Sequence, residues 1–249
     1  MGERTCIKCR GTGYVLSIIN GEIYAKECDC GIVKRSIMDG KLKSAGIPEQ
    51  FSGLSVEDFQ VDVYRLAQSM DVATSAKKIA KSFVDKYESV KGRGKGFYFF
   101  SETPGSGKTR LAVSIGNDLI KHYGEYVRFT TGGDLMSTIR STWEKSGEET
   151  KLLSQLSLVP VLILDDIGAE NPSGWVQEKM HKILDERMRA NRITFFTSNY
   201  GIDALPYDSR IRDRIRAMAM PFPFPKESVR SNLSQVENEE FLSELLQTG

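Results

Sequence analysis

Short apolar runs alternate with amphipathic segments along most of this chain. Between the runs, apolar residues recur every three or four positions, which is the spacing of one helix face. The expected strands cover 97–100, 126–130, 159–165 and 193–198, and the expected helices cover 107–122, 134–143, 174–190 and 208–217. An apolar segment at 218–222 and a short helical tail from Ser228 follow. Strands and helices that alternate in this way predict a parallel sheet with helices on both faces.

The N-terminal part of the chain has a different pattern. Apolar residues surround an Asn20-Gly21 pair, which predicts a β-hairpin with a tight turn. A connector follows that is first basic and then mixed, and apolar residues recur at helical spacing from Val63 to Tyr87. Glycine-rich residues 91–96 then end this helix. We therefore expect a small unit at 1–31, a connector at 32–60 and an α/β domain at 61–249.

The composition sets two limits on function. The 249 residues carry a formal net charge of +1, so the chain has no bulk positive charge for nucleic acid. Any nucleic-acid surface must therefore be local. No apolar run is long enough to span a membrane, and residues 1–6 lack the apolar core of a signal peptide. These features predict a cytoplasmic protein with no membrane partner.

All four cysteines lie in the first thirty residues, on either side of the expected hairpin. They form two close pairs, Cys6 with Cys9 and Cys28 with Cys30. In a cytoplasmic chain, such paired spacings favour a metal over disulfides. Four thiolates complete a tetrahedral site that suits Zn²⁺, so we expect a zinc ribbon whose metal supplies most of its folding energy. An iron–sulfur centre and a redox pair are the alternatives.

The turn after the first strand of the α/β domain carries the most specific motif. It reads Thr103-Pro104-Gly105-Ser106-Gly107-Lys108-Thr109 and leads into a helix. A glycine-rich turn of this kind, ending in Lys-Thr, is typical of a P-loop that binds a nucleoside triphosphate. Its N–H groups would face phosphate oxygens, Lys108 would reach the β- and γ-phosphates, and Thr109 would bind Mg²⁺. Glu102 stands where the full pattern has glycine, which leaves the conformation of the loop entrance open.

Two further apolar strands end in polar side chains that can complete such a site. Asp165 and Asp166 follow the buried run 161–164, which is typical of a Walker B strand. Nucleotide sites of open α/β sheets lie at this edge of the sheet. Asp165 would hold Mg²⁺ and Asp166 would orient or activate the attacking water. Asn199 ends the next strand and could bond the water or the γ-phosphate, although a strand-ending Asn is usually a turn residue.

The expected helix at 208–217 is rich in arginine. Its arginines are Arg210, Arg212, Arg214 and Arg216. On a helix, Arg210 and Arg214 share one face, and their planar groups suit phosphate or carboxylate. The segment is either an exposed, ion-paired face or the source of an arginine finger for a neighbouring subunit.

The order of these motifs resembles that of the AAA+ ATPases of the DnaC/DnaI type, which are replicative helicase loaders. The resemblance rests on the P-loop, Leu164-Asp165-Asp166-Ile167-Gly168, Thr197-Ser198-Asn199 and the arginine segment. Residues 46–51, Gly-Ile-Pro-Glu-Gln-Phe, and a cysteine ribbon before the core are similar to the family as well. The fold implied is an AAA+ P-loop NTPase core with a small N-terminal zinc ribbon. Its lid would be reduced, because about thirty residues follow Arg216.

The resemblance also implies roles for individual residues. The nucleotide contacts would be Pro104, Gly105, Ser106, Gly107, Lys108, Thr109, Arg110, Asp165 and Arg230, with Arg230 as sensor II. The catalytic residues would be Asp166, Asn199 as sensor I, and Arg214 as the finger, with Arg210 as the rival assignment. ATP, Mg²⁺ at Thr109 and Asp165, and Zn²⁺ would be the cofactors. Asp166 stands where AAA+ enzymes often have the longer Glu, which leaves the rate of hydrolysis open.

The function implied is ATP-dependent delivery of a replicative helicase hexamer onto single-stranded DNA. The ribbon would bind the helicase, and the ATPase domain would self-associate. Segment 130–143 matches the part of the family that contacts single-stranded DNA, where lysine or arginine can bind phosphate and aromatics can stack on bases. The side chains available there are Arg128, Arg140, Trp143 and Lys145, and Trp143 could equally belong to the core.

Two other functions fit the same motifs. One is a transposition helper ATPase similar to the IstB type, although those helpers usually have a helical N-terminal extension instead of a cysteine ribbon. The other is a nucleotide-gated adaptor with little hydrolysis, against which Asp166 and the finger arginine argue.

Overall fold

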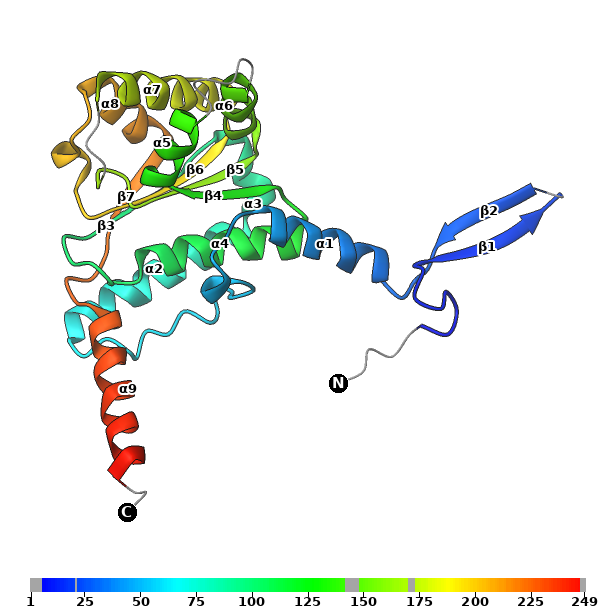
Figure 1. The fold of residues 1–249 in the computed structure, drawn as a ribbon, viewed down its shortest axis with the longest axis horizontal. Coiled ribbons are helices and arrows are strands. Elements are labelled where there is room, and N and C mark those ends of the chain that lie inside the picture. The colour runs from blue at the N-terminus through cyan, green and yellow to red at the C-terminus, as the bar shows by residue number, and fades with distance from the viewer. Residues whose placement is uncertain (1–5, 21, 142–147, 170–172, 247–249) are drawn as a thin grey trace.

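The computed structural model describes residues 6–20, 22–141, 148–169 and 173–246 (Figure 1). Its centre is a sheet of five parallel strands in the order β4-β5-β6-β3-β7. The strands are β3 (Gly96–Phe100), β4 (Val127–Thr131), β5 (Val161–Asp165), β6 (Ile193–Ser198) and β7 (Ala219–Pro223). The expected parallel sheet is therefore confirmed, and the segment after the arginine helix forms its fifth strand.

Helices cover both faces of this sheet, as the alternation of elements predicts (Figure 1). One face carries α2 (Ala67–Asp85) and α4 (Lys108–Tyr123). The other face carries α5 (Gly132–Ser141), α6 (Glu148–Leu158), α7 (Gly174–Arg189) and α8 (Ser209–Met218). Successive strand residues point to opposite faces, so Phe97 and Phe99 pack with α2 and α4 while Tyr98 packs on the other side.

The N-terminal residues form an arm that extends away from the sheet (Figure 1). Strands β1 (Tyr14–Ile19) and β2 (Glu22–Glu27) pair as an antiparallel hairpin, and every residue described in them is exposed. Helix α1 (Ile32–Ser44) links the hairpin to the body, where the Lys41 ammonium donates to the Gly124 carbonyl and lies over the Tyr126 ring. The hairpin has almost no core of its own.

The structure differs from the expected elements in several places. Helix α1 lies entirely in the stretch treated as a connector, and α6 lies in a stretch expected only to be polar. The helix expected from Val63 begins at Ala67, and the short helices α3 (Tyr87–Val90), η1 (Glu49–Phe51), η2 (Lys91–Arg93) and η3 (Ile202–Ala204) complete the connections. The tail is the long helix α9 (Val229–Leu246), which projects from the body (Figure 1). No helix in the described ranges has the length and apolar character needed to cross a bilayer.

Candidate nucleotide site and cysteine cluster

The P-loop joins β3 to α4, with Lys108 as the first residue of the helix. Gly105 and Gly107 have φ angles of 74° and 92°, a region in which glycine carries no steric penalty. Glu102 is exposed and is not among the described residues with positive φ. The loop entrance therefore does not need glycine at this position, which resolves the question raised by the sequence.

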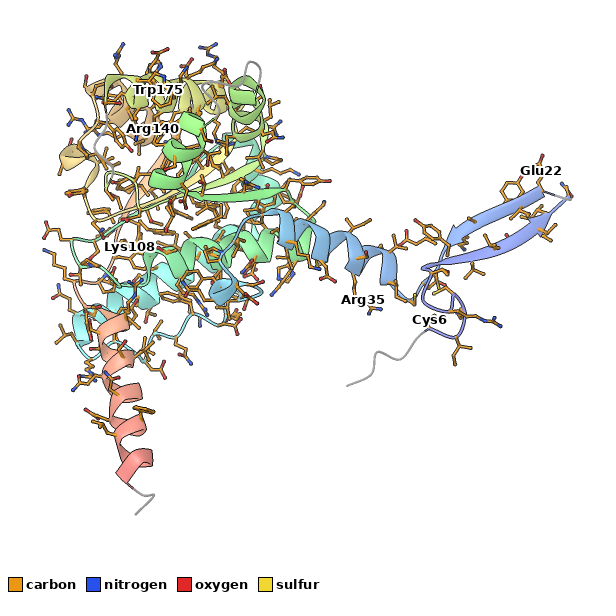
Figure 2. All side chains as sticks on the ribbon, in the orientation of Figure 1. Cys6, Glu22, Arg35, Lys108, Arg140 and Trp175 are labelled. Carbon is orange, nitrogen blue, oxygen red and sulfur yellow. The ribbon has the colours of Figure 1, made fainter. Side chains whose placement is uncertain are left out.

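The Lys108 side chain, labelled in Figure 2, contacts the P-loop segment and the residue that follows β6. Its ammonium group donates to the carbonyls of Ser101 and Thr103, both at 3.2 Å, and to the Asn199 side-chain oxygen at 3.1 Å. Lys108 is only 6% exposed, and burial lowers the pKa of its ammonium group below the ordinary value. The three acceptor oxygens hold the Lys108 ammonium group at the place where a phosphate bound in the loop would contact it.

Thr109 and Asp165 meet across the P-loop and β5. The Thr109 hydroxyl donates to Asp165 Oδ1 at 2.7 Å, and the Thr197 hydroxyl donates to the same oxygen at 2.5 Å. Burial raises the pKa of the Asp165 carboxyl, and the two hydroxyl groups oppose this shift. A hydroxyl beside a carboxylate is a donor set that fits Mg²⁺, so the residues present fit the implied metal.

Asp166 and Asn199 lie together at the ends of β5 and β6. The Asn199 amide donates to Asp166 Oδ1 at 3.1 Å, and the Asp166 N–H donates to the Thr197 hydroxyl at 2.9 Å. Asp166 is exposed and has a φ of 51°, an uncommon conformation for a residue other than glycine. The two side chains assigned to the attacking water are therefore adjacent and face solvent.

A cavity of about 670 Å³ opens beside the P-loop. It is lined by P-loop residues 105–110, by Phe51 and Phe59 of the connector, by Tyr64 just after the connector, and by Val229, Arg230 and Leu233 of α9. A second cavity, of about 450 Å³, reaches Thr109 and Asp165 from the β4 side and shares Arg230 with the first. Arg110, another predicted nucleotide contact, lines the first cavity and donates to the Asp58 carbonyl at 2.9 Å.

The two candidate fingers differ in their surroundings. Arg214 donates two hydrogen bonds to Asp185 Oδ1 of α7, at 3.2 and 2.9 Å, and its side chain is 23% exposed. Arg210 pairs with neighbouring Asp208 at 2.9 Å and keeps 73% of its side chain exposed. Within the described part of the chain, neither arginine forms a hydrogen bond or ion pair with the P-loop, so the finger assignment stays a prediction about a neighbouring subunit.

The four cysteines converge at the base of the hairpin, where Figure 2 labels Cys6. The Cys6 and Cys28 sulfurs are 3.8 Å apart, the Cys9 and Cys30 sulfurs are 3.6 Å apart, and all four lie within 4.8 Å of one another. Zn–S bonds of about 2.3 Å in a tetrahedron place sulfurs at this separation, whereas a disulfide needs about 2.05 Å. The donor set therefore fits one Zn²⁺ ion.

The residues expected to contact single-stranded DNA are only partly described. Arg128 is exposed on β4 and donates to the Ser44 carbonyl at 3.1 Å, and Arg140 is exposed on α5 (Figure 2). Trp143 and Lys145 lie outside the described residues.

Sequence reasoning missed two residues that hold the site. Thr197 bonds both Walker B acids, whereas the sequence marked it only as a member of the Thr197-Ser198-Asn199 motif and gave it no role of its own. Tyr64 is 1% exposed and donates to the Ser106 carbonyl at 2.8 Å. Nothing in its local sequence marks Tyr64, because its partner is more than forty residues away.

Known proteins are similar to this chain in both sequence and fold. Residues 47–220 match the family described as IstB-like ATP binding protein. The replicative helicase loader DnaC of Buchnera aphidicola subsp. Schizaphis graminum is 32% identical over 184 residues, which is 72% of this chain and 70% of that protein. The loader DnaI of Bacillus subtilis is 28% identical over 238 residues, which is 86% of this chain and 71% of that protein. A crystal structure of DnaI, 30% identical, aligns with a TM-score of 0.60 and covers 72% of this chain and 95% of that chain.

The matched region contains the P-loop, both Walker B acids, Asn199 and the arginine helix, and it begins after the cysteine ribbon. The predicted family and fold class are thus confirmed. The chain belongs to the family of IstB-like ATP-binding proteins, as an AAA+ protein of the DnaC/DnaI helicase-loader type.

Proposed function

We propose that this protein is an ATP-dependent loader that delivers a replicative helicase hexamer onto single-stranded DNA. The observation that carries the proposal is the linked pair of contacts Lys108–Asn199 and Thr109–Asp165, in a chain similar to proteins named helicase loaders. These contacts join the P-loop to the ends of two neighbouring strands. A triphosphate bound there would meet all four side chains at once.

Each residue of the site has a distinct part in the proposed reaction. The P-loop N–H groups and Lys108 bind the β- and γ-phosphates, and Thr109 and Asp165 would hold Mg²⁺, which supplies positive charge to the phosphate oxygens. Asp166 and Asn199, joined at 3.1 Å, orient the attacking water. Arg230 borders both cavities beside the P-loop and would contact the nucleotide as sensor II.

Self-association would complete the site. Arg210 extends from α8 as it stands, whereas Arg214 would first have to leave Asp185. A guanidinium from a neighbouring copy would stabilise charge on the transferred phosphoryl group. Loss of hydrolysis in either Arg210→Ala or Arg214→Ala, with ATP affinity retained, would identify the finger.

The ribbon at 1–31 is the proposed helicase-binding unit, because it stands apart from the nucleotide domain and exposes its apolar residues. Leu16, Ile18 and Ile23 are 68%, 74% and 71% exposed. A pull-down of the replicative helicase from the same organism tests this assignment. The full chain should retain the helicase and a chain lacking residues 1–31 should not; equal retention would refute the assignment.

A transposition helper is the second candidate, because the matching family is described by its IstB-like members. A helper would act on a transposase and duplex DNA. ATP hydrolysis stimulated by single-stranded DNA supports the loader, stimulation by duplex DNA alone supports the helper, and no hydrolysis with either supports a nucleotide-gated adaptor.

A further inference from the structure

The peptide group between Ser106 and Gly107 is held by a residue far away in the chain. Tyr64 donates its hydroxyl to the Ser106 carbonyl at 2.8 Å. Tyr64 is 1% exposed, and burial raises the pKa of its phenol well above the ordinary value, so the hydroxyl remains a donor at neutral pH. In a trans peptide the C=O and N–H groups point in opposite directions. A carbonyl held outward by Tyr64 therefore turns the Gly107 N–H toward the inside of the loop.

The preceding peptide group is held in the same way by α9. The N–H groups of Val229 and Arg230 donate to the Gly105 carbonyl at 3.0 and 3.3 Å. These N–H groups belong to the first turn of a helix, where they have no partner within the helix. The Ser106 N–H is consequently turned toward the inside of the loop as well.

Packing leaves little freedom at either position. A Cβ atom on Gly105 would lie 2.8 Å from Ser228 Oγ and 2.9 Å from Arg230 Cβ. A Cβ atom on Gly107 would lie 2.8 Å from the Tyr64 hydroxyl. The N–H groups of Ser106 and Gly107 have no acceptor of their own among the described residues. In the nucleotide-free chain, both N–H groups thus point toward the inside of the loop and have no hydrogen-bond partner there.

We propose that Tyr64 and the first turn of α9 are positioning elements that preset the P-loop amides for the β-phosphate. Rigid donors that face a ligand before it binds avoid the entropy cost of ordering them on binding. Helix α9 then takes part in nucleotide binding. The inference rests on the proposed function, because it requires a nucleoside diphosphate or triphosphate at this loop.

Binding of ADP, ATP and AMP to the full-length protein tests the inference. Tyr64→Phe keeps the ring and removes only the hydroxyl, so the affinity for ADP and ATP should fall about three- to tenfold, as expected for one hydrogen bond. Val229→Pro removes one donor at a helix position that tolerates proline and should have a similar effect. AMP lacks a β-phosphate, so its affinity, measured by competition, should not change.

Tyr123→Phe is the matched control, because the Tyr123 hydroxyl donates to the Val84 carbonyl at 2.7 Å and lies away from the P-loop. Both Phe variants should lower the melting temperature of the nucleotide-free protein, but only Tyr64→Phe should weaken ADP. Wild-type ADP affinity in Tyr64→Phe, or an equal loss for AMP, would overturn the inference. If Lys108→Ala binds ATP as well as the wild type does, the proposed function itself fails.

Discussion

Asp165 and Asp166 are neighbours in the chain but lie in opposite surroundings. Asp165 is 7% exposed and accepts hydrogen bonds from Thr109 and Thr197. Asp166 is exposed, adopts a φ of 51° and is held by Thr197 and Asn199. An uncommon backbone conformation at a functional position persists when surrounding contacts fix it. The buried acid suits a metal and the exposed acid suits the attacking water.

Asp166→Asn should separate binding from hydrolysis. Asn tolerates the left-handed conformation but is a poor proton acceptor, so ATP turnover should fall at least about a hundredfold. ATP affinity should stay within about twofold, because the P-loop contacts remain. Asp62→Asn, at an exposed acid that precedes α2, is the control. Unchanged turnover in Asp166→Asn would remove this residue from the mechanism.

Arg187 illustrates a residue whose role the sequence conceals. It lies on α7 among charged neighbours and reads as a surface arginine, yet it is 0% exposed. Its guanidinium donates to the carbonyls of Leu156, Val159 and Ile193 and to the Thr194 hydroxyl. Burial lowers its pKa to about 9, and the charge is satisfied by backbone dipoles. The side chain ties the end of α6 to the start of β6.

Replacing Arg187 should therefore destabilise the fold without touching the nucleotide site. Arg187→Ala leaves several buried carbonyls unpaired, and we expect a loss of about 3 kcal/mol in the free energy of unfolding. Arg187→Lys should recover little, because an ammonium cannot reproduce the planar fork of donors. Lys182→Ala, at an exposed position of the same helix, should be nearly neutral. Denaturant unfolding measures all three, and a neutral Arg187→Ala would contradict this role.

At the element scale, periodicity was sufficient for strands β3 to β6 and insufficient for helices α1 and α6. Buried strands such as β5 read as continuous apolar runs, and the P-loop and Walker B residues follow from motifs at their ends. Helix α1 has no buried residue and α6 is partly polar, so neither offers a clear apolar stripe. Tyr64, Thr197 and Glu227 act through contacts between distant segments, as when Glu227 accepts from the N–H groups of Arg65 and Leu66. No local pattern encodes such pairs.

The ribbon should depend on its metal while the sheet does not. Strands β1 and β2 are exposed throughout, so the metal bonds must supply most of the order in this element. The backbone N–H groups of Cys9 and Lys8 lower the pKa of the Cys6 thiol to about 7, whereas burial and the neighbouring thiols raise the pKa of the Cys28 thiol to about 12. A metal ion binds the deprotonated form of both thiols.

Treatment of the zinc-loaded protein with a chelator should raise amide exchange in residues 14–27 to that of an unfolded segment. Amides of β3 and β5 in the same sample serve as the control and should remain protected. Unchanged protection of the hairpin after metal removal would contradict the metal-dependent fold.

At the scale of the whole molecule, residues 45–64 connect the arm to the nucleotide site. The Phe129 N–H donates to the Ala45 carbonyl at 2.7 Å, just after α1. Asn117 of α4 then donates to the carbonyls of Phe51 and Leu54, and Tyr64 reaches the P-loop. Hydrogen bonds thus link the arm, α4 and the nucleotide cavity through this segment. This arrangement suits a protein in which the bound nucleotide changes the affinity for a partner protein.

The most direct test of that account is helicase loading onto circular single-stranded DNA, measured as DNA-bound helicase after removal of free protein. With ATP, the wild-type chain should increase bound helicase well above the level reached by helicase alone. Lys108→Ala should lose this increase while still binding the helicase through its intact ribbon, and Lys182→Ala should behave as the wild type. Full loading by Lys108→Ala, or no loading by the wild type, would contradict the claim that an ATP-switched site drives the delivery.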